Sequence, residues 1–156
     1  MTATAVTPRV VILVGLPGSG KSTWLKKLGA NPISSDAIRL QLSDDEADQT
    51  IHGRVFSVAR YLLRQRLELR RPVTYIDATN LVRANRKPFL KIAREFGARA
   101  EAVYFDVPLA VCLERNANRS RQVPRQVMEL MAAKLVPPSV AEGFDQVEVV
   151  AADDGL

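Results

Sequence analysis

An eight-residue motif near the start of the chain constrains its fold more strongly than any other feature. Residues 15–22 read Gly-Leu-Pro-Gly-Ser-Gly-Lys-Ser, a complete G-x-x-x-x-G-K-S phosphate-binding loop. An apolar run at 10–14 precedes the loop, and a helix-compatible stretch at 23–28 follows it. In this context a buried strand leads into a tight turn whose backbone N–H groups surround phosphate oxygens. The motif therefore predicts a strand–loop–helix unit that binds a nucleoside triphosphate.

The residues of this loop have distinct expected roles. Its glycines let the backbone approach a ligand closely, because glycine has no Cβ. Lys21 is expected to reach the β- and γ-phosphates, and the Ser22 hydroxyl is expected to bind Mg²⁺. A flexible Gly/Ser loop is the alternative, which the flanking strand and helix patterns disfavour. The predicted cofactors are thus ATP and Mg²⁺, and the predicted ATP-binding residues in the loop are Gly15, Pro17, Gly18, Ser19, Gly20, Lys21, Ser22 and Thr23.

Length and composition indicate one globular domain. The chain has 156 residues, of which 47% are apolar and 25% charged, enough to bury a core. We expect a single domain over 8–151, with flexible ends at 1–7 and 152–156. A single cysteine excludes an internal disulfide and favours a reducing compartment, so a cytoplasmic location is expected. The apolar run at 10–14 is too short to span a bilayer. We expect neither membrane attachment nor a stable protein partner.

The charge of the chain is unevenly distributed. The formal net charge is +5, and residues 83–126 contain ten Lys or Arg against four Asp or Glu. A basic face attracts polyanions by electrostatic steering and counterion release. A nucleotide enzyme, however, also needs positive potential for ATP itself. The charge is therefore compatible with a nucleic-acid partner without indicating one by itself.

Strand-like and helix-like segments alternate along the chain. Strands are predicted at 9–14, 32–35, 73–77, 100–106 and 146–150, and helices at 20–29, 36–42, 50–71, 83–96, 109–118 and 125–135. Pro72 is expected to end the long third helix. Alternating strands and helices imply parallel strands joined by right-handed crossovers. The predicted fold is a three-layer α/β/α domain with a central, mainly parallel five-stranded sheet.

Polar residues follow four of the predicted strands. The phosphate-binding loop follows the first strand, Ser34-Ser35-Asp36 the second, Asp77-Ala-Thr-Asn80 the third and Asp106 the fourth. Ligands bind at the carboxyl ends of strands in open α/β sheets. We therefore expect these groups to converge on one site.

Asp36 and Arg39 are the predicted residues for the phosphoryl acceptor. They lie three apart at the start of a helix, so they share one helical face. A carboxylate can orient an acceptor hydroxyl and take its proton, and a guanidinium can hold a phosphate with two hydrogen bonds. The alternative is an ordinary helix start, with Ser34 or Ser35 as the cap and Arg39 in a surface ion pair.

Asp77 is predicted to hold Mg²⁺, directly or through water, because it ends the third strand. Thr79 and Asn80 are predicted to contact the acceptor. An Asx-turn is the alternative role for this segment.

Arg115 and Arg119 lie four apart near the end of a predicted helix. Two guanidinium groups in this position could fold over the triphosphate and neutralise charge that develops during transfer. Arg115 is predicted to bind ATP, and Arg119 to bind ATP and act in catalysis. The alternative is a solvated basic face, which Arg121 and Arg125 nearby would extend.

Several other conspicuous side chains are expected to be structural. His52, the only histidine, has no evident partner and is placed on the surface. Trp24, Phe56 and Cys112 are placed in the core. Nine aromatic residues are too few and too scattered for a base-stacking surface.

These motifs together resemble the phage-type polynucleotide 5′-kinase family, the kinase module of end-healing RNA and DNA repair enzymes within the P-loop phosphotransferases. The resemblance extends over about 10–149. It rests on five segments, which read Gly15-Leu-Pro-Gly-Ser-Gly-Lys-Ser-Thr23, Ser35-Asp-Ala-Ile-Arg39, Asp77-Ala-Thr-Asn80, Arg115-Asn-Ala-Asn-Arg119 and Glu142-Gly-Phe-Asp145.

The resemblance implies specific roles. Asp36 matches the general base of that family, and Arg39 matches its clamp on the acceptor phosphate. Lys21 matches the triphosphate contact. Arg119 matches the lid arginine that acts on the transferring phosphate, and Arg115 matches a lid position near the adenine. The implied protein is a P-loop kinase with an arginine-bearing lid, which transfers the γ-phosphate of ATP to a 5′-hydroxyl end of RNA or DNA.

Two other functions stay open. Related small kinases with similar motifs act on metabolites, nucleotide sugars or tRNA-linked amino acids. A nucleotide-dependent switch or ATPase without an acceptor is the third function, which Asp36 and Arg39 disfavour because a hydrolase has less need of a phosphate clamp. The sequence does not choose RNA over DNA, since many polar side chains can contact a 2′-hydroxyl.

Overall fold

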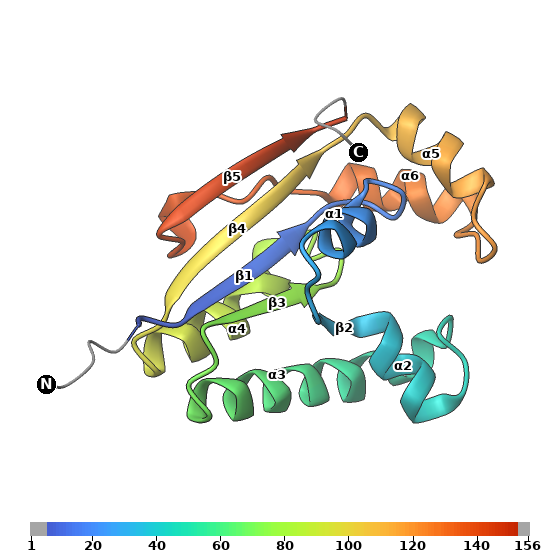
Figure 1. Cartoon of the computed structure of the whole chain (residues 1–156). Coiled ribbons are helices and arrows are strands. Elements are labelled where there is room, and N and C mark those ends of the chain that lie inside the picture. Colours follow the sequence, from blue (N-terminus) through green and yellow to red (C-terminus); the bar gives the residue numbers. More distant parts are fainter. Residues whose placement is uncertain (1–5, 153–156) are drawn as a thin grey trace, which may run out of the picture.

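The computed structural model describes residues 6–152, which form a five-stranded sheet with helices on both faces (Figure 1). All strand pairs are parallel, in the order β2-β3-β1-β4-β5. The three-layer prediction is confirmed, with a sheet that is fully rather than mainly parallel. Of the ends predicted to be flexible, 1–5 and 153–156 lie outside the described residues. The strands are β1 (Arg9–Val14), β2 (Ile33–Ser34), β3 (Val73–Asp77), β4 (Arg99–Asp106) and β5 (Gln146–Ala151).

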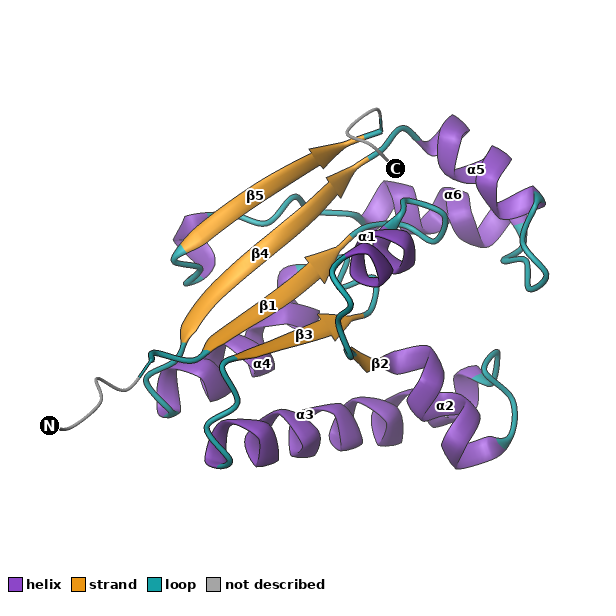
Figure 2. Ribbon diagram, viewed as in Figure 1, coloured by secondary structure: helices purple, strands orange, loops and turns teal. Residues whose placement is uncertain are grey.

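The helices fall close to the predicted positions (Figure 2). The predicted 50–71 segment divides into a short 3₁₀ helix and a long α-helix, which ends at Glu68. Pro72 does not end this helix, because the chain has already turned at Arg70, whose φ is +57°. The α-helices are α1 (Lys21–Lys27), α2 (Ser35–Ser43), α3 (His52–Glu68), α4 (Arg83–Glu95), α5 (Leu109–Ala117) and α6 (Arg125–Lys134), and the 3₁₀ helices are η1 (Gln49–Ile51) and η2 (Val140–Glu142).

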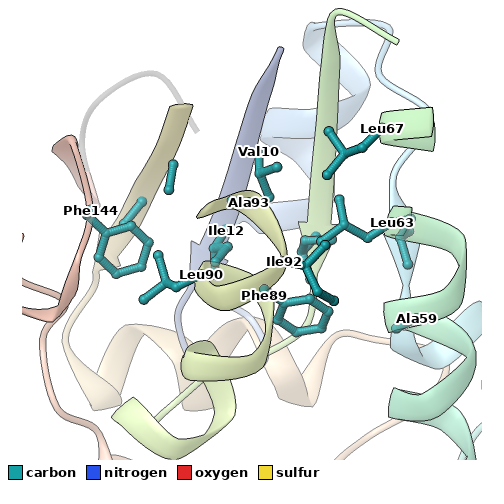
Figure 3. Packing of buried hydrophobic residues seen from close by; sticks show 14 of the residues in the cluster. Val10, Ile12, Ala59, Leu63, Leu67, Phe89, Leu90, Ile92, Ala93 and Phe144 are labelled. Atoms are coloured by element: carbon teal, nitrogen blue, oxygen red, sulfur yellow. The ribbon is translucent and has the colours of Figure 1, made fainter. Parts of the chain in front are cut away.

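Two hydrophobic clusters cover the two faces of the sheet. Val10, Ile12 and Val14 of β1 point to one face, where α3 and α4 pack (Figure 3). The alternate residues of β1, Val11 and Leu13, point to the other face, toward α1, α5 and α6. β1 is buried on both sides because helices cover both faces, which explains its nearly continuous apolar sequence.

The strand register brings the polar segments together at the carboxyl edge of the sheet. Ser34 of β2 lies directly beside Asp77 of β3. The Ser35 hydroxyl donates a hydrogen bond to the Asp77 carbonyl at 3.5 Å. α2 therefore starts next to the end of β3, and β3 is the neighbour of the strand that leads into the phosphate-binding loop. Among residues 6–152, no helix is long and apolar enough to cross a membrane.

Candidate active site

The phosphate-binding loop encloses the amine of Lys21. The side chain is buried, and Nζ donates hydrogen bonds to the carbonyl oxygens of Gly15 and Leu16, both at 2.9 Å. Burial lowers the pKa of Lys21 to about 8, an effect that Arg119 reinforces and the Asp77 carboxylate opposes. The Lys21 ammonium is thus largely withdrawn from water. A phosphate anion bound beside it would compensate for the lost hydration.

Close packing of α5 against the loop explains one of its glycines. Gly18 has a φ of +80°, and a Cβ there would lie 2.7 Å from the carbonyl oxygen of Cys112. Any other residue would be strained and would push α5 away. Arg115 of α5 also donates to the Gly18 carbonyl at 3.4 Å and to the Ala152 carbonyl at 3.4 Å. Arg115, a predicted ATP contact, therefore also ties the loop to the end of β5. Cys112 is buried in the core, as expected.

A pocket of about 1240 Å³ lies over the loop and the carboxyl edge of the sheet. Most of the predicted site residues contribute to its wall, although they come from four segments of the chain. The structure therefore brings these groups together as the strand pattern predicted. The predicted site residues that line the pocket are Pro17, Gly18, Gly20, Lys21, Ser22, Thr23, Asp36, Arg39, Asp77, Thr79, Arg115 and Arg119.

Three predicted site residues do not line this pocket. Gly15 and Ser19 are buried residues of the loop, and the Gly15 N–H donates to the Thr79 carbonyl at 3.1 Å. Asn80 is 2% exposed, and its amide nitrogen donates to the carbonyl oxygen of Leu13 at 2.8 Å. The acceptor role predicted for Asn80 has no support, because its side chain is buried and supports the strand that enters the phosphate-binding loop.

Asp36 faces the pocket between two arginines. One carboxylate oxygen accepts from Arg39 at 3.2 Å, and the other accepts from Arg121 at 3.2 Å. Arg121 also donates to the Glu46 carbonyl at 3.2 Å. Sequence reasoning named Arg121 only in the alternative of a solvated basic face and gave it no role in the site. Its partners lie 75 and 85 residues away, and no helical spacing links them. The Ser34 hydroxyl caps α2 by accepting a hydrogen bond from the Ala37 N–H at 3.2 Å, which is the cap that the ordinary-helix alternative predicted.

Arg39 is the site residue with the most unusual environment. Its side chain lines the pocket, yet the residue is only 4% exposed, and its Nε is buried without a hydrogen-bond partner among the described residues. A buried N–H without an acceptor costs about 1–3 kcal/mol. The guanidinium of Arg39 therefore keeps unused hydrogen-bonding capacity at the wall of the pocket.

The donor set fits Mg²⁺ that arrives with a nucleotide. Asp77 and Ser22 line the same pocket. Burial raises the pKa of Asp77, and Lys21 opposes that shift. A divalent cation would favour the charged carboxylate in the same way. Among residues 6–152, no group of three or more His, Cys, Asp or Glu could hold a metal alone. That suits Mg²⁺, which takes one or two carboxylates and completes its shell with phosphates and water.

The wall of the pocket also carries residues that the sequence did not assign to a site. The ring of Phe56 packs partly against the core and partly lines the pocket, with the His52 ring 4.7 Å away between centroids. His52 is exposed, as expected, but it too lines the pocket. No local pattern distinguishes these side chains from core or surface residues. The other residues in this part of the wall are Gln49, Asn85, Val127, Leu130, Met131 and Lys134.

A buried ion pair outside the pocket wall connects segments that form the site. Arg86 of α4 is 0% exposed, and its Nε and Nη2 donate to the two carboxylate oxygens of Glu142 at 2.8 and 2.9 Å. Its Nη1 donates to the carbonyl oxygens of Asn80 and Val136, both at 2.9 Å. Arg86 thus joins α4, the segment after β3 and the segment after α6. The composition count placed Arg86 in a basic face, but this guanidinium contributes no charge to the surface.

Comparison with known proteins gives a family match and a curated relative. The AAA domain family matches residues 10–138. L-seryl-tRNA(Sec) kinase of Methanococcus maripaludis is 26% identical over 143 residues, a match that covers 87% of this chain and 56% of that protein. The chain thus spans about half the length of the curated relative it matches.

Several solved structures share the fold. A protein of Chloroflexus aurantiacus described as a kinase matches 93% of this chain and 88% of its own, with 16% identity and a TM-score of 0.73. The gluconokinase of Sinorhizobium meliloti 1021 matches 95% and 85%, with 19% identity and a TM-score of 0.64. A chain of the Pnkp1/Rnl/Hen1 complex matches 80% and 43%, with 26% identity and a TM-score of 0.61. The three-layer arrangement of this chain is therefore that of P-loop kinases.

Proposed function

The chain belongs to the AAA domain family, and from this premise we propose that it is an ATP-dependent phosphotransferase whose acceptor is the 5′-hydroxyl end of a nucleic acid. The observation that carries the proposal is the arrangement of Asp36 and Arg39. Both line the pocket that Lys21 also lines, and a buried donor of Arg39 lacks an acceptor. A pocket that only binds a nucleotide has no need of this second charged pair.

The proposed reaction is an in-line transfer. The acceptor oxygen forms a bond to the γ-phosphorus while the bond from that phosphorus to the β,γ-bridging oxygen breaks, and ADP leaves. Asp36 takes the proton of the acceptor hydroxyl. Lys21 and Arg119 stabilise the charge on the β- and γ-phosphates. Mg²⁺, held by Ser22 and Asp77, would supply further charge neutralisation at these phosphates.

The apolar part of the pocket wall supports an acceptor larger than water. It offers the ring of Phe56 and the aliphatic surface of Leu130 and Met131, which suit a flat, weakly polar group such as a nucleobase. Lys134 and Arg39 add positive charge for a phosphate. An L-seryl-tRNA kinase and a chain of the Pnkp1/Rnl/Hen1 complex, both 26% identical, agree with a nucleic-acid acceptor.

The second candidate is a kinase of a small metabolite or nucleotide sugar. It keeps Asp36, Arg39 and Lys21 in the same roles and changes only the acceptor. The fold shared with a gluconokinase over 95% of the chain favours this candidate. A nucleotide-dependent switch or ATPase is less well supported, since it leaves the pairing of Asp36 with Arg39 without a use.

Transfer of label from γ-labelled ATP to a short 5′-hydroxyl oligonucleotide tests the proposal. RNA and DNA versions of one sequence are assayed beside gluconate and other hydroxylated metabolites. The expected result is labelled oligonucleotide, with no label on the same oligonucleotide already carrying a 5′-phosphate. Lys21→Ala serves as the background control. Label on a metabolite and not on either oligonucleotide would favour the second candidate, and labelled inorganic phosphate alone would favour the switch.

A further inference from the structure

We propose that the outer face of α4 is a docking surface for the phosphodiester backbone of the acceptor, beyond the nucleotide that enters the pocket. The inference rests on the proposed nucleic-acid acceptor and extends it from the terminal nucleotide to a longer chain. The α4 track, as we call this surface, consists of Arg83, Lys87, Lys91 and Arg94.

The track is a stripe of positive charge on one side of the helix. Its members are spaced by four, four and three residues, so they share one face. All four are exposed, whereas the opposite face of α4 is buried against the sheet and α3. The stripe extends about 16 Å along the helix axis. Within residues 6–152 none of the four forms a salt bridge. Glu95, the one acid of α4, is paired with Arg64 at 2.8 Å.

The track starts at the pocket. Asn85, in the first turn of α4, lines the pocket together with Lys134 at the end of α6. α4 follows directly on the segment after β3 that forms the pocket floor, and it then runs back along the sheet. Val82, the residue directly before Arg83, also lines the pocket, so a chain that leaves the pocket beside Val82 meets Arg83 first and the other cations farther along the helix.

A second segment at the rim of the pocket is acidic. The segment between α2 and η1 contains four carboxylates within five residues, and its Ala47 lines the pocket. Arg121 engages one of them, Glu46, at 3.7 Å. The other three carboxylates form no salt bridge among the described residues and repel a polyanion. The acidic segment thus disfavours an exit across it, whereas the α4 track attracts a nucleic-acid strand. The four carboxylates are Asp44, Asp45, Glu46 and Asp48.

The test compares two acceptors in a variant that lacks three of the four charges of the track. Arg83→Gln, Lys87→Gln and Lys91→Gln are combined, and transfer is measured to a nucleoside 3′-phosphate and to a 5′-hydroxyl single strand of about 20 nucleotides. For the long strand we expect kcat/KM to fall about 10- to 100-fold and the slope of its logarithm against log salt to decrease by about two. For the nucleoside 3′-phosphate we expect no change, because that acceptor does not reach α4.

A matched control removes the same charge elsewhere. Lys26→Gln, Arg70→Gln and Arg71→Gln are exposed positions on α1 and in the turn after α3. This control should transfer to both acceptors as the original protein does. Thermal unfolding of both triple variants should match the original, since exposed cations without ion pairs contribute little to stability.

Direct binding separates the two levels of the proposal. Fluorescence anisotropy of a labelled strand of the same length reports docking without turnover. Tight binding of the strand that only the α4 variant loses would support the track, whether or not transfer occurs. If such binding is seen without any transfer, the proposed kinase function fails and the track stands. Transfer to the long strand with equal rate, binding and salt slope in both triple variants would overturn the track and leave the kinase proposal standing.

Discussion

Two sides of the pocket each bury an arginine, and the two guanidinium groups differ in how their donors are used. Arg86, at the α4 side, places every nitrogen against an acceptor of the protein itself. At the α2 side, Arg39 donates a hydrogen bond to the exposed carboxylate of Asp36. Its Nε has no hydrogen-bond partner among the described residues. A buried charge is tolerated when its donors are satisfied. The satisfied arginine therefore braces the fold, and we propose that the unsatisfied one binds an anion.

The largest effect is expected from removing the brace. Arg86→Met leaves the Glu142 carboxylate buried without its cation, and such a loss costs about 3–5 kcal/mol of unfolding free energy. Urea unfolding monitored by circular dichroism measures it. The double variant Arg86→Met/Glu142→Met should be more stable than Arg86→Met alone, because it buries no unpaired charge. A cost below about 1 kcal/mol for Arg86→Met would remove the distinction between the two arginines.

Removing Arg39 should affect activity strongly and stability weakly, the reverse of what is expected for Arg86. Arg39→Met is expected to lower kcat/KM for transfer by about 10²–10³, the usual effect of losing one charged donor to a developing charge. Its unfolding free energy should fall by no more than about 1 kcal/mol, because Arg39 makes only one ion pair, to a half-exposed carboxylate. Steady-state transfer and urea unfolding are measured on the same preparation. Unimpaired transfer together with a large loss of stability would make Arg39 a second brace.

A third charged cluster, at the amino edge of the sheet, should affect stability and leave the site alone. Glu101 accepts from Arg9 at 3.0 and 2.9 Å and from Arg99 at 2.8 Å, and these hydrogen bonds hold its pKa below the usual 4.5. Glu101→Gln should cost about 1–3 kcal/mol at neutral pH.

The pH dependence of that variant follows from the sign of the shift. A carboxyl whose pKa is lowered by folding stabilises the protein above its unfolded pKa, and this contribution disappears as pH falls through the folded value. The stability difference between Glu101→Gln and the original protein should therefore shrink below about pH 4.5. Chemical unfolding at several pH values measures this difference. A difference that grows toward acid pH would contradict the assignment.

The smallest effect on stability is expected for Arg121. Arg121→Gln removes ion pairs to Asp36 and Glu46, whose side chains are 47% and 42% exposed, so the cost should stay below about 1 kcal/mol. Because Arg121 engages Asp36, the variant should change the KM of the acceptor and leave ATP binding unaltered. A changed affinity for ATP with an unchanged acceptor KM would place Arg121 with the triphosphate instead.

The elements and the phosphate-binding loop could be predicted because their signals are local. The G-x-x-x-x-G-K-S string, the apolar run before it and helical spacing each lie within a short window. Parallel strands then force Asp36 and Asp77 to one edge of the sheet, whatever the detailed packing.

The parts that sequence analysis missed depend on distant contacts. Arg86 and Glu142 are 56 residues apart, and nothing in a run of basic residues shows that one of them is buried. Arg121 meets Asp36 across 85 residues. Asn80 was predicted at the acceptor from its place after a strand, but a positive φ of 47° and its bond to Leu13 turn its side chain into the core. Whether such a polar side chain is buried or lines the site is decided by tertiary packing, which a local sequence pattern does not contain.

Replacing one carboxylate by its neutral isostere addresses the kinase proposal at its chemical step. Asp36→Asn keeps the shape of the side chain and removes its ability to take a proton. We predict that kcat for phosphoryl transfer falls by about 10²–10⁴, while the dissociation constant of ATP, measured by calorimetry, stays unchanged. Transfer at the original rate by Asp36→Asn would show that another group accepts the proton, and the proposed role of the α2 side of the pocket would be lost.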